Sequence, residues 1–67
     1  MAYDEIAKRL EVIGEELADI AIERLQASLE FGDAQAATEE RRITRARVAV
    51  EKAAGLLNGL AGDEPET

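Results

Sequence analysis

The sequence predicts an all-α fold: an antiparallel hairpin of two helices that dimerises into a four-helix bundle. Two long amphipathic segments flank a Gly-Asp pair, which predicts the hairpin. The chain has only 67 residues, so one copy can build only a small core. It contains no Cys or His, so disulfides and a structural zinc site cannot supply the missing stability. Self-association is then the common remaining way to stabilise such a chain.

The first expected helix runs from about residue 4 to residue 31. Its apolar residues recur at spacings of mostly three and four, and charged residues fall on the other side. The apolar residues are Ile6, Leu10, Ile13, Leu17, Ile20, Ala21, Leu25 and Leu29. They span an arc of about 180°, wider than the roughly 100° that covers one neighbour. We therefore expect this helix to touch more than one other helix.

Gly32 and Asp33 mark the turn, at residues 32–33. Glycine is favoured just after a helix end because positive φ costs it little, and aspartate is a favoured N-cap. A connection this short joins antiparallel neighbours. A continuous helix through Gly32 is the alternative, since glycine in a helix interior costs only about 1 kcal/mol.

The second expected helix covers residues 34–60 and carries a narrow heptad seam of the coiled-coil type. The larger residues Ile43, Val50 and Leu57 alternate there with Ala46 and Ala53. Small residues let helix backbones approach closely, and large residues opposite can fill the gaps.

The two patterns together predict the seam that forms the core and the dimer contact. It consists of Ile6, Leu10, Ile13, Leu17, Ile20, Leu25, Ile43, Ala46, Val50, Ala53 and Leu57.

The C-terminal residues are expected to lie outside the helical hairpin. Asn58 and Gly59 resemble a helix stop, and we expect fraying after Leu60. The helical domain would then comprise residues 1–61. Residues 62–67 contain no aliphatic core residue and no aromatic residue, and are expected to form a disordered acidic tail.

Charge is distributed unevenly between the two expected helices. Residues 2–31 hold eight acidic and three basic residues, a net charge of −5, whereas residues 34–61 hold three acidic and five basic residues, a net charge of +2. In the hairpin, Asp19 and Glu23 are expected beside an arginine cluster. This cluster consists of Arg41, Arg42, Arg45 and Arg47. The agreement favours the hairpin, although exposed ion pairs contribute only about 0 to 1 kcal/mol each.

The residue types present exclude most catalytic and metal chemistry. Without His or Cys, the single serine, Ser28, has no suitable base, and a di-iron carboxylate site lacks its histidines. Glu11, Glu15 and Asp19 follow one another on a single helix face, which does not converge on a Mg²⁺ or Ca²⁺ ion. We expect no enzyme, no metal ion and no cofactor.

The N-terminal sequence lacks a basic stretch followed by an apolar run, so we expect no signal peptide. No apolar segment approaches the roughly 20 residues needed to span a bilayer. The expectation is a cytoplasmic protein without a membrane partner.

A small non-enzymatic protein-protein interaction or regulatory module is the function expected from these features. Its partners would be a second copy and another protein. Val12 and Ile22 lie outside the apolar arc, and Glu11 and Glu15 obtain no nearby arginine, so these four form the candidate partner surface. A merely solvated acidic face is the alternative for the two glutamates.

An RNA-binding regulator, with DNA less favoured, is the alternative function. The four arginines of the cluster lie within seven residues, and twofold symmetry would double them. The net charge of −7 opposes binding to nucleic acid. Tyr3 and Phe31 are the only aromatic residues on which bases could stack.

Overall fold

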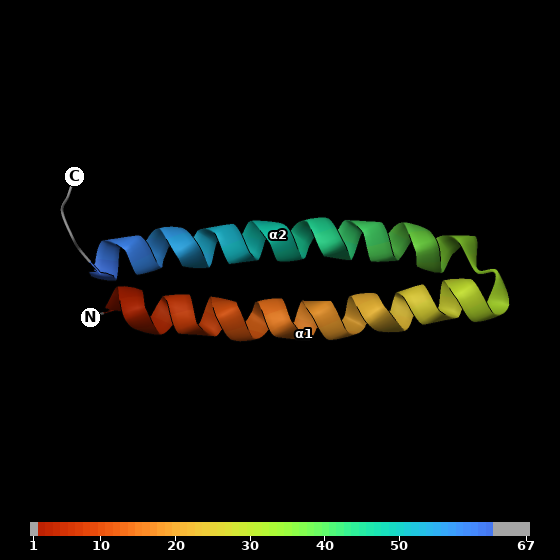
Figure 1. Cartoon of the computed structure of the whole chain (residues 1–67), viewed down its shortest axis with the longest axis horizontal. Coiled ribbons are helices and arrows are strands. Elements are labelled where there is room, and N and C mark those ends of the chain that lie inside the picture. The colour runs from red at the N-terminus through yellow and green to blue at the C-terminus, as the bar shows by residue number, and fades with distance from the viewer. Residues whose placement is uncertain (1, 63–67) are drawn as a thin grey trace.

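The computed structural model describes residues 2–62, with side chains up to Leu60, and forms two antiparallel helices joined by a tight turn (Figure 1). Helix α1 spans Ala2–Phe31 and helix α2 spans Ala34–Gly62. The predicted all-α hairpin is confirmed. Helix α1 begins slightly earlier than expected, and α2 continues beyond the expected stop.

Turn geometry agrees with the residue chemistry expected there. Gly32 has φ of 64°, the left-handed conformation that favours glycine. Asp33 caps α2: its Oδ1 accepts a hydrogen bond from the Ala36 amide at 3.1 Å, and its carbonyl accepts one from the Ala37 amide at 3.1 Å. A continuous helix through Gly32 is therefore ruled out.

The end of α2 differs from the expectation because Asn58 is used by a contact between the helices. Its Nδ2 donates a hydrogen bond to Glu11 Oε2 at 2.8 Å, which ties this turn of α2 to α1. The helix continues through Gly59 to Gly62, so the first residue of the expected tail is helical. Residues 63–67 of that tail lie outside the described residues.

Small residues of α1 form the line along which it approaches α2. Ala7, Gly14 and Ala21 are buried and follow one another at seven-residue steps. A Cβ atom added to Gly14 would lie 3.6 Å from Glu51 Cγ and 3.9 Å from Val50 Cγ1. The α1 backbone therefore lies directly against side chains of α2.

On α2 the two most buried residues of the contact line are alanines. Ala36 and Ala54 are buried, at exposed fractions of 1% and 3%. The half-buried side chains along this line are Glu40, Ile43, Arg47, Val50 and Leu57. The contact between the helices thus combines alanines, larger aliphatic residues and two charged residues.

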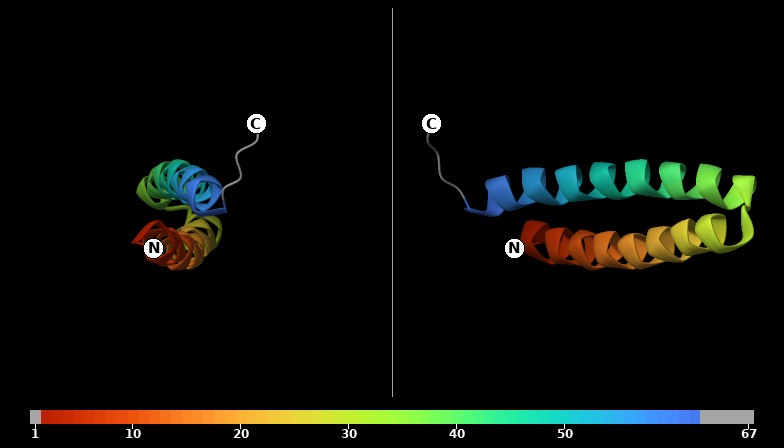
Figure 2. Two further views of the ribbon diagram at one scale, coloured as in Figure 1. Left: turned by 90° about the vertical axis from the view of Figure 1, so that its left-hand side faces the viewer. Right: turned by 45° about the vertical axis from the view of Figure 1, so that its right-hand side comes forward.

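The hairpin is a single layer of helices (Figure 2). Its extents are 50 × 20 × 11 Å, and no further helix or strand among the described residues covers either broad side. Among the described residues, no large side chain is fully buried. Both broad sides of the layer are therefore open, and large apolar residues lie on each of them.

Candidate interaction surfaces

One broad side of the hairpin carries a row of three isoleucines on α1. Ile6, Ile13 and Ile20 each precede one of the buried small residues, which places them about 100° from the contact line on one flank. Their exposed fractions are nearly the same, at 42%, 41% and 42%. Leu10 and Leu17 lie between this row and α2 and are half-buried. An apolar row with a seven-residue repeat is the kind of surface that another helix can cover.

Helix α2 adds a row of mostly small residues to the same side. Arg24 lies on the isoleucine flank, three residues after Ala21, and its Nη1 is 3.6 Å from Glu39 Oε1. Glu39 therefore marks the corresponding flank of α2, and seven-residue steps from it reach Ala46, Ala53 and Leu60. We call this surface the isoleucine face; it consists of Ile6, Ile13, Ile20, Ala46, Ala53 and Leu60.

The eleven residues of the predicted seam fall into three places. Half-buried between the helices are Leu10, Leu17, Ile43, Val50 and Leu57. On the isoleucine face are Ile6, Ile13, Ile20, Ala46 and Ala53. Leu25 differs, because it follows Ala21 by four residues and so lies on the other side of the hairpin. The predicted seam is therefore one broad side of the hairpin plus its midline, except for Leu25.

The predicted seam omits several of the small residues that bring the helices together. They include Ala7, Gly14 and Ala54. A signal was present in the sequence, since Ala7, Gly14 and Ala21 are small and seven residues apart. Small residues at heptad spacing permit close approach of two helices, as the neighbourhood of Gly14 shows.

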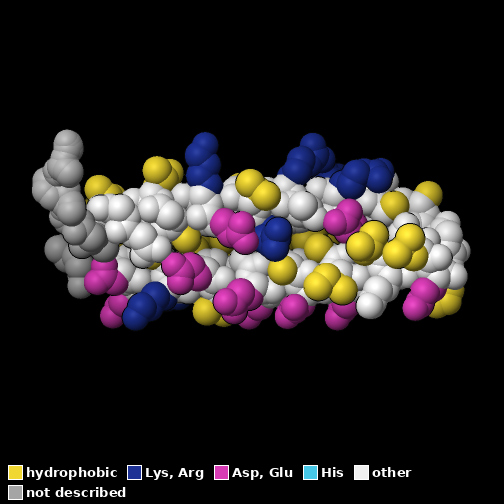
Figure 3. All heavy atoms as spheres, in the orientation of Figure 1, with side chains coloured by type: hydrophobic (Ala, Val, Ile, Leu, Met, Phe, Trp, Pro, Cys, Tyr) yellow, Lys and Arg dark blue, Asp and Glu magenta, His cyan; other side chains and the backbone are white. Residues whose placement is uncertain are grey.

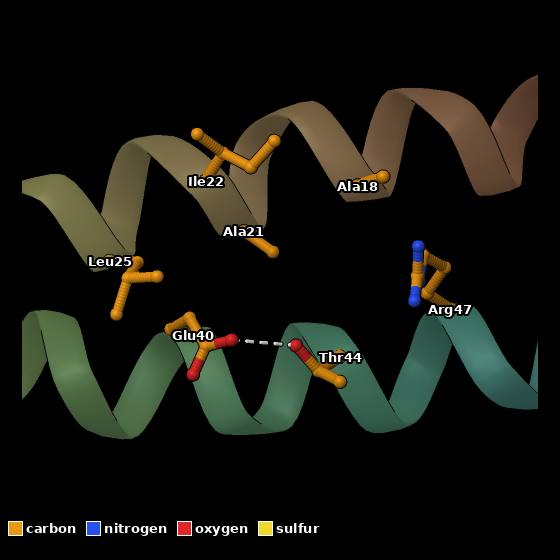
Figure 4. Close-up of a pocket in the computed structure, with 7 residues that line it drawn as sticks. All are labelled: Ala18, Ala21, Ile22, Leu25, Glu40, Thr44 and Arg47. Atoms are coloured by element: carbon orange, nitrogen blue, oxygen red, sulfur yellow. Dashed lines mark hydrogen bonds between the residues drawn. The ribbon is translucent and has the colours of Figure 1, made fainter.

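The other broad side contains an open groove of about 290 Å³ between the helices (Figure 4). Ile22 and Leu25 of α1 provide apolar side chains along one wall. On the α2 wall, Thr44 Oγ1 donates a hydrogen bond to Glu40 Oε2 at 2.8 Å. The remaining lining residues are Ala18, Ala21 and Arg47. We call this side the groove face.

The candidate partner surface extends from the groove face, where Glu15 and Ile22 lie, to the outer edge of α1, where Val12 lies. Val12 and Ile22 are exposed at 52% and 53%, and Glu15 shares a stripe with Ile22 because they are seven residues apart. Leu29, exposed at 75%, continues this stripe toward the turn. Glu11 differs from the expectation, since it accepts the hydrogen bond from Asn58. The outer edge of α1 and the adjoining wall of the groove face therefore combine acidic and exposed apolar side chains.

The structure divides the arginine cluster. Arg47 is half-buried and its Nε lies 3.8 Å from Glu51 Oε2, one helical turn further along α2. The other three members, Arg41, Arg42 and Arg45, are exposed. The predicted juxtaposition with Asp19 and Glu23 is wrong as an ion-pair arrangement, because neither acid forms an ion pair in the described part of the chain.

Rotation about the helix axes explains this difference. Asp19 lies two residues before buried Ala21, and Glu23 lies two residues after it. At 100° per residue, both side chains point about 160° away from the side of α1 that contacts α2. The acids of α2, in contrast, lie toward α1: Glu39 pairs with Arg24, and Glu51 packs at Gly14. Figure 3 shows the outcome on one side, with acidic side chains along α1 and basic ones projecting from the outer edge of α2.

No group of three acidic side chains within residues 2–62 is arranged to hold a metal ion. Neither helix, over the same residues, has a stretch long and apolar enough to cross a membrane.

No protein-family model matches the chain, and neither a curated protein nor a solved structure is significantly similar to it.

Proposed function

We propose that this chain is a non-enzymatic protein-protein interaction module that works as a homodimer, with two hairpins packed through their isoleucine faces into a four-helix bundle. The observation that carries the proposal is the row of Ile6, Ile13 and Ile20, each more than 40% exposed in a chain with no fully buried large side chain among its described residues. Complete burial of an isoleucine contributes about 1.5 to 3 kcal/mol, so covering the exposed part contributes roughly 1 kcal/mol per side chain.

A second copy is the simplest partner for this face. A twofold interface uses the same patch on both subunits, so three isoleucines per chain contribute twice. The resulting bundle has two layers, and the half-buried Leu10, Leu17 and Val50 become part of a core between them. Two layers around one core are the usual construction of a stable domain, which a single-layer hairpin lacks.

Sedimentation equilibrium of wild-type protein, Ile13→Asp and Val12→Asp tests the dimer. These neighbouring residues are both exposed aliphatics, but Ile13 lies on the isoleucine face and Val12 on the outer edge. We expect wild type and Val12→Asp to have twice the chain mass of 7.3 kDa, and Ile13→Asp to sediment as a monomer with reduced helicity. A wild-type protein that sediments at 7.3 kDa and unfolds cooperatively contradicts the proposal.

The outer edge of α1, together with the adjoining wall of the groove face, is the proposed contact for another protein. This surface remains uncovered in the dimer and presents Glu15 and Ile22 along the groove and Val12 at the outer edge. A partner of complementary chemistry would offer basic and apolar side chains. In a pull-down from the native cell, a dimeric Glu15→Lys/Ile22→Asp variant should lose proteins that the wild type retains. An identical set of retained proteins would argue against this contact.

An RNA-binding regulator is the second candidate, supported by the outer side of α2. Arg41, Arg42, Arg45 and Lys52 are exposed there, and all three acidic residues of α2 lie toward α1. A gel-shift titration with RNA and duplex DNA at low salt tests this candidate, with Arg41→Glu/Arg45→Glu as the control. Lack of any shift at tens of micromolar protein would remove it.

A further inference from the structure

Two symmetric arrangements can join two hairpins through the same broad side. In one, the twofold axis is parallel to the helices, the turns lie at the same end, and α1 of each copy covers α2 of the other. In the other, the axis is perpendicular to the helices, the turns lie at opposite ends, and like helices cover each other. From the positions of large, small and charged residues, we infer that this chain adopts the same-end arrangement. The inference rests on the homodimer proposed above.

The two rows of the isoleucine face are in register with each other. Gly14 lies against Glu51, so Ile13 is close to level with Ala53 along the hairpin. Seven-residue steps then bring Ile20 level with Ala46 and Ile6 level with Leu60. The row on α1 is uniformly large, whereas two of the three residues in the row on α2 are alanines.

This size difference favours the same-end arrangement. With α1 of one copy over α2 of the other, Ile13 and Ile20 meet the partner's Ala53 and Ala46, so large side chains fill the space left by small ones. The opposite-end arrangement sets isoleucines against isoleucines along one edge and alanines against alanines along the other. A distance between the two layers that accommodates isoleucine against isoleucine leaves voids where alanine faces alanine.

A charged pair on the same broad side gives an independent reason. Near the turn, Arg24 Nη1 lies 3.6 Å from Glu39 Oε1, and the two side chains are 38% and 43% exposed. The same-end arrangement stacks this pair on its symmetry mate, which forms a single charged layer. The opposite-end arrangement sets it against the apolar end of the other copy, near the partner's Leu10 and Leu57. A polar layer at seam positions is an established means of specifying how helices pair.

The rim charges agree with this choice. Helix α1 has a net charge of −5 and α2 of +2, so α1 over α2 brings opposite charges together. Glu23 and Arg42 are both exposed, and neither forms an ion pair in the described part of the chain. In the same-end dimer, Glu23 of one copy lies level with the partner's Arg42 at the rim, where the two can pair.

Distances between spin labels measured by double electron-electron resonance test the arrangement. The chain has no cysteine, so Glu30→Cys, near the turn, and Glu5→Cys, at the other end, each provide a single exposed labelling site. The same-end dimer should give roughly 15 to 30 Å for both homodimers, since helix axes in a bundle are about 8 to 10 Å apart. The opposite-end dimer would separate the two labels at position 30 by about 40 Å.

A mixed dimer gives the reverse pattern and acts as the matched control. One chain labelled at position 5 and one at position 30 should show only the long distance in the same-end arrangement. A long distance in the homodimers with a short one in the mixture would overturn the inference and leave the homodimer intact. Loss of dipolar coupling together with a mass of 7.3 kDa would overturn the homodimer itself, and the inference with it.

Arg24→Leu/Glu39→Leu tests the charged layer separately. The variant should remain dimeric, because two aliphatic side chains replace the ion pair on an apolar side. Its label at position 30 should show a second, long distance beside the short one, since one barrier to the opposite-end arrangement has been removed. A single short distance in this variant would overturn the role of the charged layer.

Discussion

Gly14 of α1 lies against Val50 of α2, where an added Cβ would be 3.9 Å from Val50 Cγ1 and 3.6 Å from Glu51 Cγ. Both distances are ordinary van der Waals contacts, so one methyl group fits without moving the backbones. Gly14→Ala should therefore stabilise the protein by about 0.5 to 1 kcal/mol, because alanine is a better helix former.

Unfolding followed by circular dichroism at equal protein concentration measures this gain. Gly55→Ala is the matched control, since no atom lies within 4 Å of its added Cβ and only helix propensity changes. The two gains should be similar. A loss at Gly14 with a gain at Gly55 would show that the helices pack more closely than the distances indicate.

Gly32 is the one described glycine with a positive φ, at 64°. Gly32→Ala should destabilise the protein by about 1 kcal/mol, because a side chain with Cβ is strained in this conformation. Gly32→Asn should cost less, since asparagine tolerates the left-handed region. Denaturant midpoints of the three proteins test this order, and equal midpoints for alanine and glycine would contradict it.

The Asp33 side chain accepts the Ala36 amide hydrogen bond that starts α2. Asp33→Ala removes this N-cap and should cost about 1 kcal/mol, whereas Asp33→Asn and Asp33→Ser should retain most of the stability. Thermal unfolding separates these variants. If alanine matched serine, the cap would contribute nothing to the stability of the hairpin.

Val50 and Val48 allow a test of the side of α2 that packs against α1. Val50 is half-buried at the contact, whereas Val48 is exposed at 54%. Val50→Asp should lower stability by about 2 to 3 kcal/mol, enough to remove most helicity from a small domain, and Val48→Asp should change it by less than about 0.5 kcal/mol. Circular dichroism and sedimentation equilibrium report both effects. Comparable losses in the two variants would show that α2 is rotated from the position described.

Local chemistry made the hairpin predictable. The conformational freedom of Gly32 and the capping oxygen of Asp33 act within a few residues, so the turn could be identified without knowing what packs where. The helices themselves followed from the spacing of apolar residues. Their ends were less predictable, because Asn58 engages Glu11, a residue far away in the sequence.

The rotation of each helix about its own axis could not be predicted in the same way. Large apolar residues cover an arc of about 180° on the first helix, and such an arc does not tell which part faces the neighbour in the same chain. The contact uses Gly14 and Ala21, while Ile13 and Ile20 lie beside it. The position of the turn predicts that Glu23 and Arg42 lie at the same height along the hairpin. Whether their side chains point toward each other depends on which residues of each helix form the contact line, and this the sequence pattern does not specify.

The small residues at the contact between the helices also have a consequence for how stability depends on protein concentration. The described residues include no large, fully buried side chain, so in the proposed homodimer much of the stability would come from the second copy, and folding and association would form a single equilibrium. In that case the folded fraction would rise with protein concentration, and dilution would remove the proposed binding surface along with the dimer. Expression level alone would thereby decide whether partners encounter a recognisable surface or an unfolded chain open to proteolysis.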